Sequence, residues 1–280
     1  MVTLQDRVEL VRSESERLQA YLQKLPLDVW DRPSACDLWT VADVVGHLVW
    51  VADFYGDGIA RGVNGDTSTP EGAPVPGSLD GPSLDDFISQ RSIALRRQLG
   101  DQLLAAFEQR FHWFNDLLAG LGPEDRVKPC YHLNRLREAQ EFVVMSLQEL
   151  TLHGWDICSS VEPAAGLPND CLPALTERIP TRRLPWSIPF QIRGAPPIRY
   201  RFELTGPGAS NQDIVVEAGK ARVEPAGPDG ANVTIRCDTG IFVLLMYGRL
   251  TLESARQDGR LEVQGEPALT SAFDRWLMGG

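Results

Sequence analysis

The stretch FVVMSLQELTLHGWDIC, residues 142–158, decides the fold of the N-terminal part of the chain. Apolar residues occupy nearly every side of its helical wheel, so a helix formed here must be buried around most of its circumference. The exception is a narrow polar sector that contains Glu149, His153 and Asp156. A carboxylate and an imidazole in such surroundings cost several kcal/mol unless they are paired or bound to a metal. This helix therefore needs helical neighbours, and its polar sector needs a partner.

Three other segments provide those neighbours. Thr40 and Asp43 form a capping box that begins a helix extending to about residue 60. Apolar residues at spacings of three and four predict the other helices. Those helices cover 4–25, 83–121 with a bend near Gly100, and 137–161, while the Gly- and Pro-rich residues 62–82 form a long surface crossover. The sequence predicts a four-helix bundle.

The amino-acid composition and the hydrophobic pattern change after residue 161. Residues 162–195 are rich in proline, and residues 196–280 contain short β-rich runs separated by glycine, together with two apolar helical segments. We therefore predict an α+β protein of two domains: a helical bundle over 1–161, a linker over 162–195, and a small α/β domain over 196–280.

Composition narrows the classes of partner. The 280 residues are 43% hydrophobic and carry a net charge of −11, which disfavours nucleic acid and anionic lipid as partners. No stretch approaches the roughly 18–20 apolar residues of a membrane span. The five cysteines are scattered without a C-x-x-C pair, which fits a reducing compartment. We expect a cytoplasmic monomer or homodimer that acts on small molecules.

Three of the four histidines follow an acidic residue by four positions, a spacing that places both side chains on one helical face. The helical wheel separates these pairs. Glu108 and His112 lie away from the apolar face of their helix, which predicts solvated side chains. His132 lies in a loop without a partner pattern, and we interpret it as a surface or loop-packing residue.

His47 differs, because it lies in the broad apolar arc of its helix, whereas Gly46 lies on the polar side. The Asp43 side chain serves in the capping box that Thr40 begins, so we do not count it as a metal ligand. His47, Glu149 and His153 thus form a candidate metal set whose open fourth position is typical of catalytic zinc. Iron, nickel or manganese would accept the same ligands, and an internal Glu–His hydrogen bond is the alternative to a metal.

Further candidates surround this set. Asp156 lies one helical turn from His153 and is placed either to orient its ring or in a surface ion pair. Arg249 is a candidate for binding an anionic substrate. The alternative is that its positive charge stabilises the C-terminus of a helix. The sequence assigns no position in the site to Arg91 or Arg135. Residues interpreted as packing residues are Trp39, Trp155 and Cys158.

Two segments resemble the metal-binding motifs of the mycothiol-dependent maleylpyruvate isomerase family, whose members have DinB-like bundles. The segments are PSACDLWTVADVVGHL (33–48) and QELTLHGWDI (148–157). A third, ANVTIRCDTGIFVLLMYGRL (231–250), is similar to the sterol-carrier-like domain that many members carry. The resemblance implies zinc bound by His47, Glu149 and His153, with mycothiol or another low-molecular-weight thiol as cosubstrate.

That resemblance implies isomerisation of maleylpyruvate by thiolate addition, bond rotation and elimination, or a related thiol S-transfer. Two other hypotheses stay open: a thiol- or lipid-binding protein with a vestigial metal site, and a metal-dependent hydrolase with Asp156 as the base. A dianionic substrate conflicts with the negative net charge unless arginines cluster locally. The sequence does not locate such a cluster.

Overall fold

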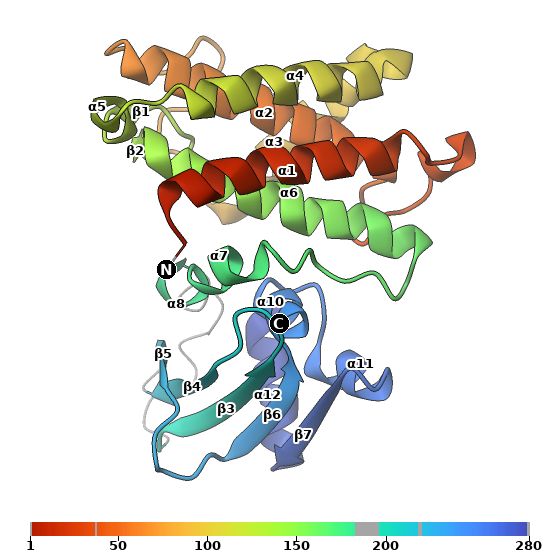
Figure 1. Ribbon diagram of the computed structural model, residues 1–280, viewed down its shortest axis with the longest axis vertical. Coiled ribbons are helices and arrows are strands. Elements are labelled where there is room, and N and C mark those ends of the chain that lie inside the picture. The colour runs from red at the N-terminus through yellow and green to blue at the C-terminus, as the bar shows by residue number, and fades with distance from the viewer. Residues whose placement is uncertain (1, 37, 183–195, 218–219, 279–280) are drawn as a thin grey trace. The chain divides into compact units, whose positions relative to one another are not determined.

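The computed structural model describes residues 2–36, 38–182, 196–217 and 220–278. The chain divides into two compact units, one helical over 2–165 and one mixed over 166–280 (Figure 1). The predicted α+β fold is confirmed. In the described ranges, no helix is long and apolar enough to cross a lipid bilayer. All five cysteines lie in the described residues, and no disulfide bond joins any two of them.

Four long helices form the bundle of the first unit. Helix α1 packs against α4 and α6, and α2 packs against the same two helices. The buried helix predicted from residues 142–158 is α6, whose apolar residues face both α1 and α2. The bounds are α1 (Leu4–Leu22), α2 (Val41–Val63), α4 (Leu103–Ala119) and α6 (Ala139–Val161).

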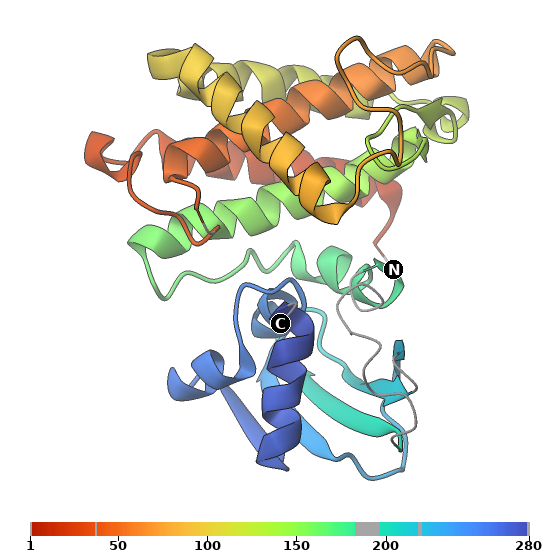
Figure 2. The ribbon, with the colours of Figure 1, turned by 180° about the vertical axis from the view of Figure 1, so that it is seen from behind.

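One predicted helix is in fact two. Gly100 has a φ of +49°, a conformation that glycine adopts without strain, and it ends α3 (Gly81–Leu99). The short helix η2 (Gly100–Gln102) then leads into α4. Helix α4 joins the bundle, whereas α3 lies across the outside of α2 (Figure 2). The expected single bent helix over 83–121 is therefore corrected to a bundle helix and an outer helix.

Glycines on α2 determine how closely its neighbours approach. A Cβ atom at Gly46 would lie 2.6 Å from the Cβ of Arg96, so only glycine admits α3 at this distance. The side of α2 that the sequence assigned to solvent is thus covered here. A Cβ atom at Gly58 would lie 2.9 Å from the carbonyl oxygen of Tyr131, so the chain before α6 also lies directly on α2.

Short elements connect these helices. The capping box predicted at Thr40 and Asp43 is present at the start of α2. The crossover after α2 is attached to the segment before α6, because Gly77 N–H donates to the carbonyl of Leu133 at 2.8 Å. The remaining short elements of this unit are η1 (Leu27–Val29), α5 (Pro123–Arg126), β1 (Pro129–Cys130) and β2 (Arg137–Glu138), the last two paired antiparallel.

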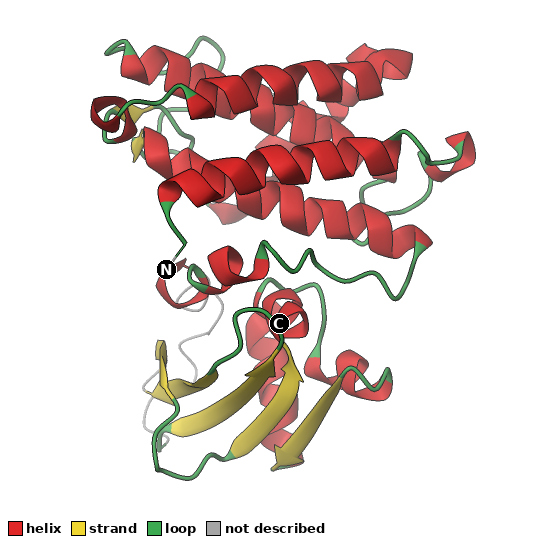
Figure 3. Cartoon of the chain, viewed as in Figure 1, coloured by secondary structure: helices red, strands yellow, loops and turns green. Residues whose placement is uncertain are grey.

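The second unit contains a five-stranded sheet with the order β5-β4-β3-β6-β7 (Figure 3). Strands β3 and β6 are parallel and the other neighbours are antiparallel. The strands are β3 (Ile198–Thr205), β4 (Asn211–Glu217), β5 (Lys220–Pro225), β6 (Val233–Asp238) and β7 (Leu261–Gly265). Its helices are α7 (Leu172–Thr176), α8 (Ile179–Arg182), α10 (Thr239–Met246), α11 (Leu252–Gln257) and α12 (Pro267–Met278).

The two faces of this sheet differ. On the covered face, Phe202 contacts Phe242 of α10 and Phe273 of α12, with ring centroids 4.9 and 5.8 Å away. On the other face, the fully buried carboxylate of Asp213 accepts hydrogen bonds from Arg199 and Arg201, which links β3 to β4. Of the segment assigned to a linker, residues 166–182 belong to this unit, and residues 183–195 lie outside the described residues.

Candidate metal centre

The three predicted ligands converge between α2 and α6. The Oε2 atom of Glu149 lies 3.2 Å from His47 Nε2 and 3.3 Å from His153 Nε2. One ligand atom from each residue lies within 4.8 Å of the other two. His47 is 5% exposed, so the set is placed in the bundle interior, as the helical wheel predicts.

The ring of His153 is oriented by Asp156. Its Nδ1 atom lies 2.9 Å from the Oδ2 atom of Asp156, a side chain that is fully buried. A carboxylate only accepts hydrogen bonds, so Nδ1 carries a proton, and Nε2, which faces Glu149, is the ring nitrogen available to a metal ion. Of the two options that the sequence leaves open for Asp156, the structure has the one beside the His153 ring, and the burial of Asp156 excludes the surface ion pair.

Ser92 of α3 orients the ring of His47 in the same way. The serine Oγ donates to the carbonyl of Ile88 at 2.7 Å and lies 3.2 Å from His47 Nδ1. Because its only proton is directed at Ile88, the oxygen accepts from Nδ1–H of His47. Nε2 of His47 therefore also faces Glu149, at 3.2 Å from Oε2. The sequence reasoning missed Ser92, since no pattern in α3 showed that this helix lies against Gly46.

With Nδ1 protonated on both rings, the two Nε2 atoms face one carboxylate, and they hold it either as N–H donors or as ligands of a shared metal ion. Burial alone would lower the pKa of His153, but hydrogen bonds to Asp156, Cys36 and Glu149 raise it well above its ordinary value. Burial would raise the pKa of Glu149, and hydrogen bonds from His153 and His47 lower it below its ordinary range. A proton or a divalent metal ion satisfies this set, and two imidazoles with one carboxylate match a zinc donor set.

Family profiles match both parts of the chain. The sequence profile of the mycothiol maleylpyruvate isomerase N-terminal domain matches residues 11–158, more than half of the chain. The chain belongs to this family. The profile of the SCP-2 sterol transfer family matches residues 198–277.

Two solved structures are similar to the chain over most of its length. The crystal structure of the mycothiol-dependent maleylpyruvate isomerase has a TM-score of 0.60 and 16% sequence identity, covering 89% of this chain and 90% of that one. The crystal structure of a histidine-to-alanine mutant of that enzyme has a TM-score of 0.59 and 15% sequence identity, with the same coverage of both chains. At this identity the likeness shows a shared fold. No curated protein matches the sequence of this chain significantly.

The loop before α2 lies against the candidate metal centre. The ring of Trp39 lies 5.0 Å from that of His47 and 6.1 Å from that of His153, and its Nε1–H donates to Ser89. Trp39 is thus half-buried over the two imidazoles, and its interpretation as a core anchor is corrected. The thiol of Cys36, which the sequence reasoning did not select, also lies beside His153 and Asp156.

The other two histidines behave differently from each other. His112 is exposed and contacts Asp116 at 3.5 Å, as expected of a solvated residue. His132 is only 8% exposed, so of the two options offered by the sequence, the surface option is wrong. Burial, followed by the positive charge of Arg137, lowers its pKa to about 3.

The remaining candidates lie elsewhere. Arg249 belongs to the second unit, where it is part-buried and its Nη1 donates to the carbonyl of Tyr247, the C-terminal cap of α10. That contact fits a cation at a helix C-terminus. Trp155 is 6% exposed and is a core residue, as expected. Burial raises the pKa of Cys158 to about 11, in keeping with a packing role.

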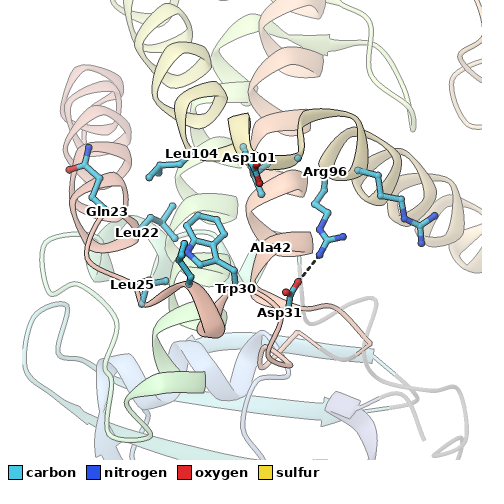
Figure 4. A pocket seen from close by; sticks show the side chains of 13 residues that line it. Leu22, Gln23, Leu25, Trp30, Asp31, Ala42, Arg96, Asp101 and Leu104 are labelled. Atoms are coloured by element: carbon cyan, nitrogen blue, oxygen red, sulfur yellow. Dashed lines mark hydrogen bonds and ion pairs between the residues drawn. The ribbon is translucent and has the colours of Figure 1, made fainter.

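A separate cavity of about 780 Å³ opens where α1, α3 and α4 meet (Figure 4). Trp30 and Leu22 form part of its apolar wall. Arg96 projects at its edge and forms ion pairs with Asp31 at 3.0 Å and Asp43 at 3.7 Å. These pairs join α3 to the start of α2. None of the three candidate ligands lines this cavity.

Proposed function

We propose that this chain is a zinc-dependent isomerase that uses a low-molecular-weight thiol to convert a cis-unsaturated keto acid, such as maleylpyruvate, into its trans isomer. The observation that carries this proposal is the convergence of His47, Glu149 and His153 with both Nε2 atoms directed at one carboxylate. Membership of the mycothiol maleylpyruvate isomerase family and the similar fold of the solved isomerase support it.

The proposed ligands are His47, Glu149 and His153, a set that leaves a fourth position open as in catalytic zinc sites. When bound there, a zinc ion lowers the pKa of a thiol and supplies a thiolate near neutral pH. Ser92 and Asp156 keep the Nδ1 protons in place, so that both Nε2 atoms stay available. Trp39 lies over the imidazoles and limits the access of water.

The reaction itself needs little from the protein. The thiolate sulfur forms a bond to one carbon of the double bond, and the π electrons move to the conjugated carbonyl oxygen as an enolate. The remaining single bond rotates, the enolate electrons return, and the carbon–sulfur bond breaks to release the trans acid and the thiolate. The protein has to orient the substrate and stabilise the enolate. We propose Arg249 as a residue that binds a substrate carboxylate.

The same centre would serve thiol S-transfer with an electrophile that carries a leaving group. The two reactions differ in the fate of the thiol, because isomerisation returns it and transfer consumes it. Both rest on the same ligands, and membership of an isomerase family favours isomerisation.

The test incubates zinc-loaded protein with mycothiol and maleylpyruvate and follows both the ultraviolet absorbance of the double bond and the concentration of free thiol. We expect isomerisation at constant thiol. His47→Ala should lower the rate by more than the roughly 100-fold typical of residues that orient a metal ligand. His112→Ala removes an exposed histidine and should leave the rate unchanged. Folded, zinc-bearing protein that leaves maleylpyruvate unchanged, or full activity of His47→Ala, would contradict the proposal.

A further inference from the structure

His132 is held against α2 by the glycines of that helix. A Cβ atom at Gly62 would lie 2.4 Å from the Sγ of Cys130, and one at Gly58 would lie 2.9 Å from the carbonyl oxygen of Tyr131. The absence of side chains at both positions lets the segment before α6 approach α2 closely. The imidazole consequently lies among aromatic rings, with centroids 5.9 Å away in each case: Phe54, Tyr55 and Phe142.

The hydrogen bonds of His132 fix its tautomer. Its Nδ1 atom accepts from the backbone N–H of Asn134 at 3.2 Å, so Nδ1 carries no proton. The ring is neutral near pH 7, because burial and Arg137 lower its pKa to about 3. The proton therefore resides on Nε2. Among the residues that the structure describes, Nε2–H of His132 has no hydrogen-bond acceptor, and Nε2 is not one of the fully buried polar atoms that lack a partner, so solvent reaches this donor.

A row of rings connects His132 with the metal centre. On α2, the ring centroids of His47 and Trp50 are 6.1 Å apart and those of Trp50 and Phe54 are 4.9 Å apart. Phe54 then contacts His132. Residues 47 and 54 are seven apart, or roughly 10 Å along a helix. The carboxylate of Glu149 acts to raise the pKa of His132, against the larger effect of burial.

Two arginines near His132 share one acid. Glu141 Oε1 accepts from Arg135 at 2.6 Å and from Arg137 at 3.1 Å. Both guanidinium groups act on the imidazole of His132, as does the Glu141 carboxylate. The surroundings of His132 therefore hold two guanidinium groups and two carboxylates, those of Glu141 and Glu149, beside a neutral N–H donor that can bind a carboxylate oxygen.

We propose that His132 is a substrate-binding residue, whose Nε2–H donates a hydrogen bond to the carboxylate of a small unsaturated diacid at the end remote from the metal centre. This inference rests on the proposed function, since it takes the substrate to be such an acid. The donor is neutral and fixed in its tautomer, so it orients a carboxylate without changing its own charge.

The test measures the binding of maleate, a cis-diacid, to the zinc-loaded full chain by calorimetry without thiol. His132→Phe keeps an aromatic ring but removes the donor, and maleate binding should weaken about 10- to 100-fold. His132→Gln places an amide N–H near the position of Nε2 and should bind within about threefold of wild type. Zinc content should be unchanged in both variants, and in turnover His132→Phe should raise KM more than it lowers kcat.

Three results would overturn the inference: wild type that binds no maleate, His132→Phe that binds it as tightly as wild type, or loss of zinc from both variants, which would assign His132 a structural role. Failure of the proposed function is distinguishable, because it would appear as absent isomerisation by wild-type protein that still binds maleate through His132.

Discussion

Replacing Ser92 by alanine tests whether α3 belongs to the metal centre. The serine hydroxyl is fully buried and accepts from His47 Nδ1–H, and alanine leaves that donor without an acceptor. A buried, unsatisfied donor costs about 1–3 kcal/mol, and each 1.4 kcal/mol corresponds to a tenfold change in affinity. Alternatively, the proton moves to Nε2 of His47 and competes with the metal. We therefore expect zinc affinity to fall about 10- to 100-fold, the range seen when residues that orient metal ligands are removed.

The assay is competition for zinc against a chromophoric chelator at pH 7.5. Ser146→Ala is the matched control, because Ser146 is 1% exposed and donates to the carbonyl of Phe142 at 2.7 Å, as Ser92 does to Ile88. It makes no hydrogen bond to a candidate ligand in the described structure. Equal zinc affinity of Ser92→Ala and wild type, or an equal loss in Ser146→Ala, would refute the role assigned to Ser92.

Three further predictions concern packing and protonation. Gly46→Ala would place a Cβ atom 2.6 Å from that of Arg96 and should lower the free energy of unfolding by about 1–3 kcal/mol. In Gly154→Ala the nearest atom to the new Cβ would lie 3.8 Å away, so this control should be neutral or stabilising. Thermal unfolding of the two variants compares these effects. His132 has a folded pKa of about 3 against about 6.5 unfolded, so the stability it provides above pH 6.5 is lost as the pH falls towards 3. Urea unfolding should show about 2 kcal/mol of this loss between pH 7.5 and 5, and His132→Gln should lack it. Because the pKa of His153 is raised, zinc uptake near pH 7 should release about one proton. Calorimetry in buffers of different ionisation enthalpy measures this release. Zinc uptake without proton release would contradict the raised pKa.

The convergence of His47, Glu149 and His153 was predictable because its signal is local. Glu149 and His153 interrupt an otherwise apolar helix, and His47 lies on the apolar side of its own helix, so each is anomalous within its own segment. Asp156 follows from the same helical spacing. The bundle was predictable from periodicity for the same reason, since α1, α2 and α6 each bury a face that the sequence marks.

What the sequence did not reveal depends on tertiary contacts. Helix α3 buries only Ser92, so it carries no apolar face from which its place outside α2 could be inferred. The burial of His132 follows from the close approach of its loop to Gly58 and Gly62, and loops have no periodicity that marks an inner side. In the sequence, Trp39 has the features of an ordinary core aromatic. Only the structure shows that its loop lies over the imidazoles of His47 and His153.

Anomalous diffraction at the zinc absorption edge, from crystals of protein purified without chelator, tests the central claim most directly. We expect one strong peak in the bundle, about 2.0–2.2 Å from Nε2 of His47, Nε2 of His153 and a carboxylate oxygen of Glu149. The Nδ1 atoms should keep their hydrogen bonds to Ser92 and Asp156. A fully folded protein with no peak at this position, or a peak bound instead by Cys36, would contradict it.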